Sequence, residues 1–290
     1  MLEDQANMIR EARARRPEAV KAAASARQRR PWLGDSGHVM IIAADHPARG
    51  TLAAGSRHMA MANRFDLLDR ILVALSRPGV DGVLGTSDII EDLLLLGALD
   101  GKLAVGSMNR GGLPGAAFEM DDQFTGYRAE GIAEFGLDAG KMLLRINMDD
   151  PASVSTMAAC AAAINELAAR KIIALIEPFM TRSVDGTARN DLSADAVIRS
   201  MAIASGLGTT SAYSWLKIPV VDDMDRVTEA STLPVLLLGG DLADRPDEMF
   251  ARWQKALNLP NVRGLVVGRN LLYPPDDDVA AAVDIAVSLL

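Results

Sequence analysis

The sequence is poor in the residues that metal sites and hydrolase sites commonly use. Its 290 residues include three histidines, His38, His46 and His58, and no two of them have the spacing of metal ligands on one element. The serine-hydrolase elbow motif is also missing. Residues 45–50, after the first expected strand, do not match the glycine-rich fingerprint of dinucleotide-binding proteins. We therefore expect neither a metal nor an organic cofactor.

Cysteine and aromatic residues are scarce, and acidic residues outnumber basic ones. The single cysteine, Cys160, cannot form an internal disulfide, which fits a reducing cytoplasm. Aromatic residues make up 4% of the chain and hydrophobic residues 49%, a mixture typical of aliphatic strands covered by alanine-rich helices. The net charge of −8 argues against a nucleic-acid surface, and we expect no stretch to be long and apolar enough to span a bilayer. These features predict a cytoplasmic protein that binds neither nucleic acid nor membrane.

The dominant pattern is a short apolar strand followed by a helical stretch. Strands are expected at 38–44, 80–84, 102–107, 141–147, 171–177, 213–220, 234–238 and 264–267. Eight alternating units of this length predict an α/β protein with a closed parallel (β/α)8 barrel, the TIM-barrel fold. The structural alternative is an open doubly wound sheet, against which the missing dinucleotide fingerprint argues.

Helical spacing fills the segments between these strands and extends beyond them at both ends. Helices are expected at 61–76, 153–170, 193–205, 246–257 and 276–290. Residues 3–29 predict one or two leading helices, split near Pro17. Because no linker or low-complexity tract is present, we expect one domain over 1–290 with residues 1–30 as a helical extension. Barrels of this kind commonly assemble, so we also expect a homo-oligomer.

The alternation of strand side chains indicates which polar groups face the barrel interior. In the strand 141–147 the apolar residues share one face, which must meet the helices. Lys141, Arg145 and Asn147 therefore lie on the interior face, and we expect them, with His46, to bind substrate. The same alternation places Lys217 in the interior of the sixth strand.

Two carboxylates complete the predicted cluster. Asp45 ends the first strand and Glu177 ends the fifth, where Pro178 is expected to terminate the strand. A charged residue at a strand end is usually a solvated boundary residue. Charges from four strands that converge inside one barrel are too costly to be incidental, and active sites of these barrels lie at the carboxyl ends of the strands.

These groups fit Schiff-base chemistry. A lysine is nucleophilic when its amine is neutral, and burial and nearby cations both favour that form. Lys217 is the expected nucleophile, and Glu177 and Asp45 are the expected groups for proton transfer. Lys141 is the second candidate nucleophile. It is less favoured because it lies near the start of its strand, at the bottom of the barrel.

Glycine turns follow the last two strands. Gly239 and Gly240 come after the seventh strand, and Gly268 and Arg269 come after the eighth. Barrels often bind phosphate in these two loops, where glycines let backbone N–H groups approach the anion. A Gly-Gly pair is also a common tight turn, so the order of the two loops carries the prediction of a phosphate site.

With these residues in view, the chain resembles the class I aldolase superfamily that includes deoxyribose-phosphate, tagatose-bisphosphate and archaeal-type fructose-bisphosphate aldolases. The resemblance spans about residues 38–270 and rests on the motifs ADH at 44–46, LKIP at 216–219, PVLLLGG at 234–240 and VGRN at 267–270. It implies that Lys217 forms the Schiff base, that Asp45 assists proton transfer or binds a substrate hydroxyl, and that the glycine turns hold a phosphate. Glu177 resembles the tagatose-bisphosphate branch, since archaeal-type fructose-bisphosphate aldolases have tyrosine there.

The resemblance also sets the expected reaction, which is that of a lyase on a phosphorylated ketose or keto-sugar acid. The chain is similar to a barrel group often encoded near inositol-catabolism enzymes. That similarity implies 6-phospho-5-dehydro-2-deoxygluconate as a substrate, cleaved to dihydroxyacetone phosphate and malonate semialdehyde. Two alternatives remain open: a lysine-dependent acyl or ketol transferase, and a non-catalytic barrel that binds a sugar phosphate.

Overall fold

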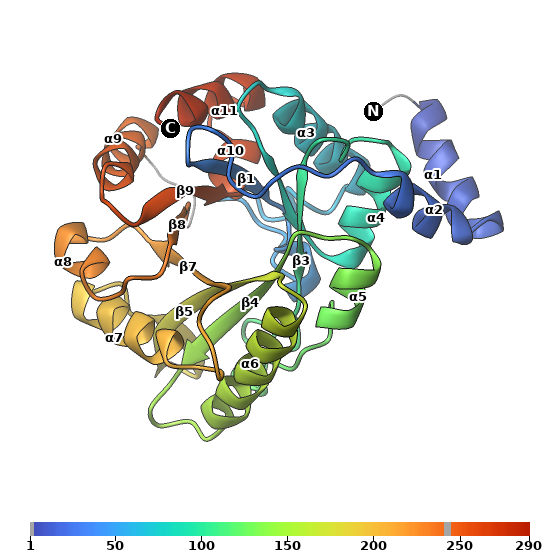
Figure 1. The fold of residues 1–290 in the computed structure, drawn as a ribbon. Coiled ribbons are helices and arrows are strands. Elements are labelled where there is room, and N and C mark those ends of the chain that lie inside the picture. The colour runs from blue at the N-terminus through green and yellow to red at the C-terminus, as the bar shows by residue number, and fades with distance from the viewer. Residues whose placement is uncertain (1–2, 241–244) are drawn as a thin grey trace.

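The computed structural model describes residues 3–240 and 245–290. Eight parallel strands form a closed barrel in which β9 pairs back to β1 (Figure 1). In order around the barrel they are β1 Val39–Ala43, β2 Gly82–Gly85, β3 Leu103–Ser107, β4 Ala139–Ile146, β5 Ile173–Val184, β7 Ser214–Pro219, β8 Val235–Leu238 and β9 Val262–Val267. The predicted (β/α)8 barrel is confirmed, and each expected strand overlaps an observed one.

Helices surround the barrel, and the first two pack outside the ring against the fourth (Figure 1). They are α1 Glu3–Arg15, α2 Glu18–Ala26, α3 Arg64–Ser76, α4 Ser87–Leu95, α5 Ala129–Glu134, α6 Ala152–Ala169, α7 Ala194–Ser205, α8 Met224–Thr228, α9 Pro246–Leu257, α10 Arg269–Leu272 and α11 Val279–Ser288, with a short 3-10 helix at Pro47–Arg49. Asn63, Ser193 and Asp278 begin α3, α7 and α11 with side chains that accept backbone N–H groups. The five predicted helices and the break near Pro17 are confirmed.

The fifth barrel strand is longer than expected. β5 continues through Pro178 to Val184 and forms an antiparallel hairpin with β6, Thr187–Asn190. The prediction that Pro178 terminates this strand is therefore wrong. The pairing of β5 with β7 ends at Ile176, so β5 has an edge where the proline occurs. Proline is tolerated there because an edge does not need its missing N–H.

Alternate side chains of the strands build two apolar layers. One layer lies between the strands and the helices, and the other fills the barrel interior with residues that include Ile41, Leu175, Trp215 and Leu236. Closure between β9 and β1 requires Gly264, whose φ is +130° and whose added Cβ would lie 1.9 Å from the Val39 carbonyl oxygen. Above the interior layer, toward the carboxyl ends of the strands, the inward positions become charged.

The segment after α2 closes the opposite end of the barrel. The buried guanidinium of Arg27 donates to the Lys102 carbonyl at 2.6 Å and to Asp138 Oδ2 at 3.1 Å. Trp32 packs edge-on against Trp215, with ring centroids 5.6 Å apart. The leading helices therefore anchor a plug at the amino ends of the strands.

Helix α6 is long and apolar enough, by length and composition alone, to cross a membrane. The expectation that no segment would have that character is therefore wrong. In the structure α6 packs against β4 and β5, with Cys160, Ile164 and Leu167 buried. This is the position of a helix that covers the barrel core.

Candidate active site

The strand register brings the predicted charges to one end of the barrel. Leu175 pairs with Lys141 on one side and with Trp215 on the other. Glu177 and Lys217 each lie two residues further along their strands, so they occupy the next inward layer together. Asp45 follows β1 and is 2% exposed, while Glu177 and Lys217 are 8% and 5% exposed. The predicted inward positions of these charged groups agree with the geometry.

The carboxylate of Glu177 bridges two lysines. Its Oε1 lies 2.7 Å from Lys217 Nζ, and its Oε2 forms an ion pair with Lys141 Nζ. Lys141 Nζ also lies 3.3 Å from Asp45 Oδ2. Burial raises the pKa of Glu177, but the charges of Lys141 and Lys217 and their hydrogen bonds outweigh burial and hold that pKa below its ordinary value. Glu177 is therefore an ionised carboxylate between two amines.

Lys141 is nearer to the site than its place in the sequence indicated. It is the third residue of β4, one inward layer below Glu177, and its long side chain reaches both carboxylates. Lys141 therefore lies near the start of its strand, as expected, and still belongs to the charged cluster. Burial lowers the pKa of its amine well below the ordinary value, and the charges of Lys217 and Arg110 act in the same direction.

Arg110 and Ser107 belong to this cluster and were not predicted. Arg110 forms an ion pair with Asp45 Oδ2, and its Nε donates to Ser107 Oγ at 2.9 Å. Ser107 Oγ in turn donates to Asp45 Oδ2 at 3.2 Å. Ser107 occupies an inward position at the end of β3, so the alternation of side chains along this strand could have predicted it. Arg110 follows in a loop, where the strand period gives no orientation.

Arg145 does not contact the lysine cluster. Its guanidinium donates to Glu119 Oε1 at 2.8 Å and to the Glu119 carbonyl at 2.5 Å. Glu119 lies in the segment 108–128, which connects β3 to α5. The prediction that Arg145 binds substrate is not supported by these contacts, because the side chain holds this loop instead.

Asn147 is likewise engaged locally. Its Oδ1 accepts the N–H of Asp149 at 3.1 Å, and its backbone N–H and carbonyl both bond Ser153 Oγ. The residue therefore shapes the turn between β4 and α6. The inward face of β4 was predicted correctly. The strand ends at Ile146, however, so the alternation of side chains does not extend to residue 147.

The two glycine turns lie side by side. Arg269 Nη2 donates to the Gly240 carbonyl at 3.3 Å, and Asn270 Nδ2 donates to the Gly239 carbonyl at 2.8 Å. Glycine is required at 268, since an added Cβ would lie 2.3 Å from the Ala43 carbonyl oxygen and 3.0 Å from the His46 ring. The four residues predicted to bind phosphate therefore adjoin one another and His46, and phosphate binding itself stays a prediction.

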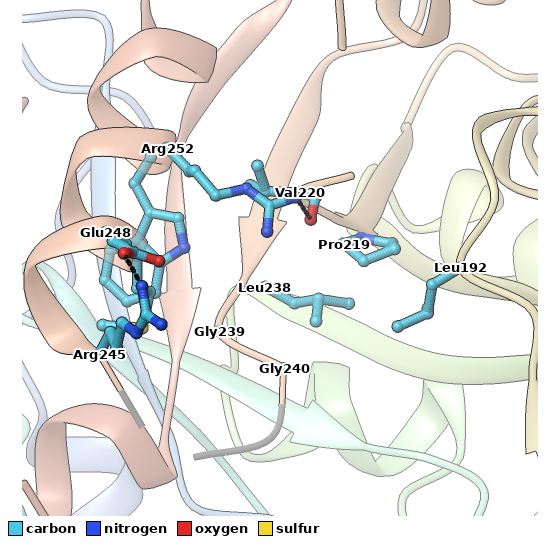
Figure 2. Close-up of a pocket in the computed structure, with 11 residues that line it drawn as sticks. Leu192, Pro219, Val220, Leu238, Gly239, Gly240, Arg245, Glu248 and Arg252 are labelled. Atoms are coloured by element: carbon cyan, nitrogen blue, oxygen red, sulfur yellow. Dashed lines mark hydrogen bonds and ion pairs between the residues drawn. The ribbon is translucent and has the colours of Figure 1, made fainter. Parts of the chain in front are cut away.

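A cavity of about 370 Å³ opens beside these turns (Figure 2). It is lined by Leu192, Pro219, Val220, Leu238, Gly239, Gly240, Arg245, Glu248, Met249, Arg252 and Trp253. Pro219 pairs with Leu238, one inward position beyond Lys217 on the same strand, a rise of about 7 Å. In Figure 2 the Arg252 guanidinium extends toward the Val220 carbonyl, and Arg245 lies beside Glu248. The cavity therefore has an apolar wall and charged groups of both signs, and it lies at the carboxyl ends of β7 and β8, beside the glycine turns.

His46 lies near three cationic side chains, those of Arg269, Lys217 and Lys141. Its Nδ1 lies 3.9 Å from Asp45 Oδ1, and a quarter of its side chain is exposed. Burial, followed by the charges of Arg269, Lys217 and Lys141, lowers the pKa of the imidazole from 6.5 to about 3. His46 is therefore neutral at physiological pH and can exchange hydrogen bonds with a substrate without bringing charge.

The lowered pKa of His46 gives a testable pH dependence. In the unfolded chain this residue is protonated below about pH 6.5, whereas in the native protein it is protonated only below about pH 3. The free energy of unfolding therefore falls, through this residue, as the pH drops across that window. We expect the native His46 ring to keep the NMR signals of a neutral imidazole at pH 5, and His46→Gln to weaken the pH dependence of stability. A native titration midpoint near 6.5 would contradict this assignment.

Fold and site together define a (β/α)8-barrel protein with a lysine–carboxylate cluster at the carboxyl ends of its strands. The Cgl0159-like family profile matches residues 37–287, and the chain belongs to that family. The crystal structure of Cgl0159 from Corynebacterium glutamicum is 54% identical, with a TM-score of 0.98 over 100% of this chain and 97% of that one.

More distant barrels share the fold. An archaeal fructose 1,6-bisphosphate aldolase is 18% identical, with a TM-score of 0.64 over 89% of this chain and 95% of that one. A fructose-bisphosphate aldolase from Slackia heliotrinireducens is 11% identical, with a TM-score of 0.63 over 99% and 91%. At these identities the likeness establishes the fold alone. No curated protein sequence matches this chain.

Proposed function

We propose that the protein is a class I aldolase whose Lys217 forms a Schiff base with a phosphorylated ketose or keto-sugar acid. The observation that carries this proposal is the 2.7 Å contact between Lys217 Nζ and Glu177 Oε1 inside the barrel. A buried amine beside a carboxylate has both groups that imine chemistry needs, a nucleophile and a proton carrier. The same fold is found in a Schiff-base-forming fructose-1,6-bisphosphate aldolase.

In the proposed reaction Lys217 first gives one proton of its ammonium group to Glu177, and the amine that results attacks the substrate carbonyl carbon. The nitrogen passes a second proton to the carbonyl oxygen to give a carbinolamine, and Glu177 then returns the first proton to the departing hydroxyl, which leaves as water. The resulting iminium accepts the electron pair of the adjacent carbon–carbon bond as that bond breaks. In this step the Asp45 carboxylate removes the proton of the hydroxyl that becomes the aldehyde. The enamine is then protonated, and water releases the ketone from Lys217.

Lys141 competes with Lys217 for the role of nucleophile. Its amine is fully buried and its pKa is strongly lowered, so it is the other source of a neutral amine. Position favours Lys217, which lies one layer nearer the open end and directly below Pro219 of the cavity wall. We assign Lys141 the task of holding Glu177 Oε2, so that Oε1 stays against Lys217.

The arginines and the glycine turns at the open end support an anionic substrate. The cavity combines apolar walls with Arg245 and Arg252, and it shares Gly239 and Gly240 with the proposed phosphate turn. A substrate that carries a phosphate and is joined to Lys217 would extend along this surface. Our specific candidate is 6-phospho-5-dehydro-2-deoxygluconate, which would yield dihydroxyacetone phosphate and malonate semialdehyde.

A retro-aldol screen tests the proposal. The purified protein is incubated with that candidate, fructose 1,6-bisphosphate, tagatose 1,6-bisphosphate and deoxyribose 5-phosphate, and the released aldehyde or dihydroxyacetone phosphate is measured with coupling enzymes. We expect cleavage of at least one compound that is lost in Lys217→Met. Cleavage only after addition of an acceptor would identify a transferase instead. Ligand-induced thermal stabilisation without turnover or trappable imine would identify a non-catalytic binding barrel.

A further inference from the structure

Arg110 is a buried cation that the proposed chemistry does not use. It is 9% exposed and ends in an ion pair with Asp45 Oδ2. Ser107, which accepts from Arg110 Nε, and Lys141 contact the same oxygen of Asp45. The other oxygen, Oδ1, faces the His46 ring at 3.9 Å. The three donors thus gather on one oxygen of Asp45 and turn the second toward the neutral imidazole.

The position of Arg110 is fixed by the segment 108–128. Directly before it, the side chain of Asn109 accepts the N–H of Leu143 at 2.7 Å and donates to the Leu143 carbonyl at 2.5 Å. This exchange continues the β3–β4 pairing beyond the end of β3. Arg110 therefore begins the loop from a rigid point, although it is outside the strand.

Two buried arginines hold the rest of the same segment. Arg49, in the short helix after β1, donates to Asp122 Oδ2 at 2.6 Å and to the Gly112 carbonyl at 2.6 Å. Arg145, on β4, binds Glu119. Each of these pairs is almost fully enclosed, so opening the loop would leave charges buried without partners. The segment is thus clamped between the ends of β1 and β4, with Arg110 directed at Asp45.

We infer that Arg110 is a positioning residue for Asp45: it fixes the carboxylate by one oxygen so that the other is presented beside His46 to a substrate hydroxyl. This inference rests on the proposed aldolase function. A guanidinium suits the task because it remains charged at every working pH and offers several donors in a rigid plane. Lys141 cannot replace it, since its amine is shared with Glu177.

Substitution of Arg110 tests this inference. We expect Arg110→Gln to lower kcat roughly 10- to 100-fold with a smaller change in KM, because the misdirected carboxylate acts on the reacting hydroxyl and not on the phosphate. The acid limb of the pH–rate profile should move to higher pH, since Asp45 would lose its ion pair with Arg110, keep the one with Lys141, and take up a proton more readily. Arg110→Lys should recover part of kcat and return the acid limb toward the wild type.

Controls separate this inference from a folding defect and from failure of the proposed function. Arg64→Gln removes another arginine–aspartate pair, with Asp88, at the start of α3 and should leave kcat and the pH profile unchanged. Circular dichroism and the melting temperature report whether each variant folds. A folded Arg110→Gln with wild-type kcat and pH profile would overturn the inference.

A structural measurement keeps the inference testable if the wild-type protein forms no imine and cleaves no substrate. In that case the proposed function fails, and the carboxyl 13C signal of Asp45 is followed with pH in the wild type and in both Arg110 variants. An unchanged titration in Arg110→Gln would reject the positioning role, whereas a shift to higher pH that Arg110→Lys reverses would support it.

Discussion

Replacement of Lys217 by methionine is expected to remove imine formation and to lower kcat/KM by a factor on the order of 10⁴ or more. Methionine retains the apolar stem but has no amine, so no covalent intermediate can form there. The variant should fold, because Glu177 keeps its ion pair with Lys141. Steady-state kinetics on the substrate found by the screen, together with the melting temperature, measure both expectations.

Two further lysine variants bracket this result. Lys255→Met changes an exposed residue of α9 and should leave kcat/KM unchanged. Lys141→Met should reduce kcat, because Glu177 Oε2 loses its partner, yet the imine should still form on Lys217. If Lys217→Met retained most of its activity while Lys141→Met lost all of it, the roles of the two lysines would have to be exchanged.

Glu177→Gln is expected to affect both stability and rate. The amide has the same size but no charge, so two buried lysines lose their shared counter-ion. A loss of about 3–5 kcal/mol in the free energy of unfolding is expected for such an uncompensated pair. The rate should fall roughly 10²- to 10⁴-fold, since glutamine cannot take and return a proton. Chemical denaturation and steady-state kinetics test the two effects separately.

The sign of the pH dependence distinguishes this mechanism from simple loss of packing. The native pKa of Glu177 is lowered, so its stabilisation is complete above the unfolded value of 4.5 and is lost as the pH falls toward the native pKa. The difference in stability between the wild type and Glu177→Gln should therefore shrink in acid.

Lys141→Met added to Glu177→Gln should recover part of the loss of stability. Glu166→Gln, on the exposed face of α6, should change stability by less than about 0.5 kcal/mol.

Hydrophobic alternation was sufficient to predict the barrel. The eight strands and the interior positions of Lys141 and Lys217 follow from local periodicity, because a parallel barrel repeats one packing rule around its circumference. Glu177 was predicted from its place at the expected end of the fifth strand. The hairpin beyond Pro178 could not be predicted in this way. Its strands are exposed at their tip, and the edge that tolerates the proline exists only in the folded barrel.

The candidate site was predicted where strands carry it and was missed where loops do. Glu177 and Lys217 lie on barrel strands and Asp45 lies just after one, so their convergence follows from topology. Arg110 reaches Asp45 from a loop, and Arg145 is diverted by Glu119 of that same loop. Both contacts depend on the path of the segment 108–128, which has no periodic signal in the sequence.

The most direct test of the account is to locate the covalent intermediate. The protein is mixed with dihydroxyacetone phosphate, reduced with borohydride, digested and analysed by mass spectrometry, with Lys217→Met and Lys141→Met treated in parallel. We expect a single reduced adduct on Lys217 in the wild type and in Lys141→Met, and no adduct in Lys217→Met. An adduct on Lys141, or no adduct in the wild type with either dihydroxyacetone phosphate or the substrate found by the screen, would contradict the proposed mechanism.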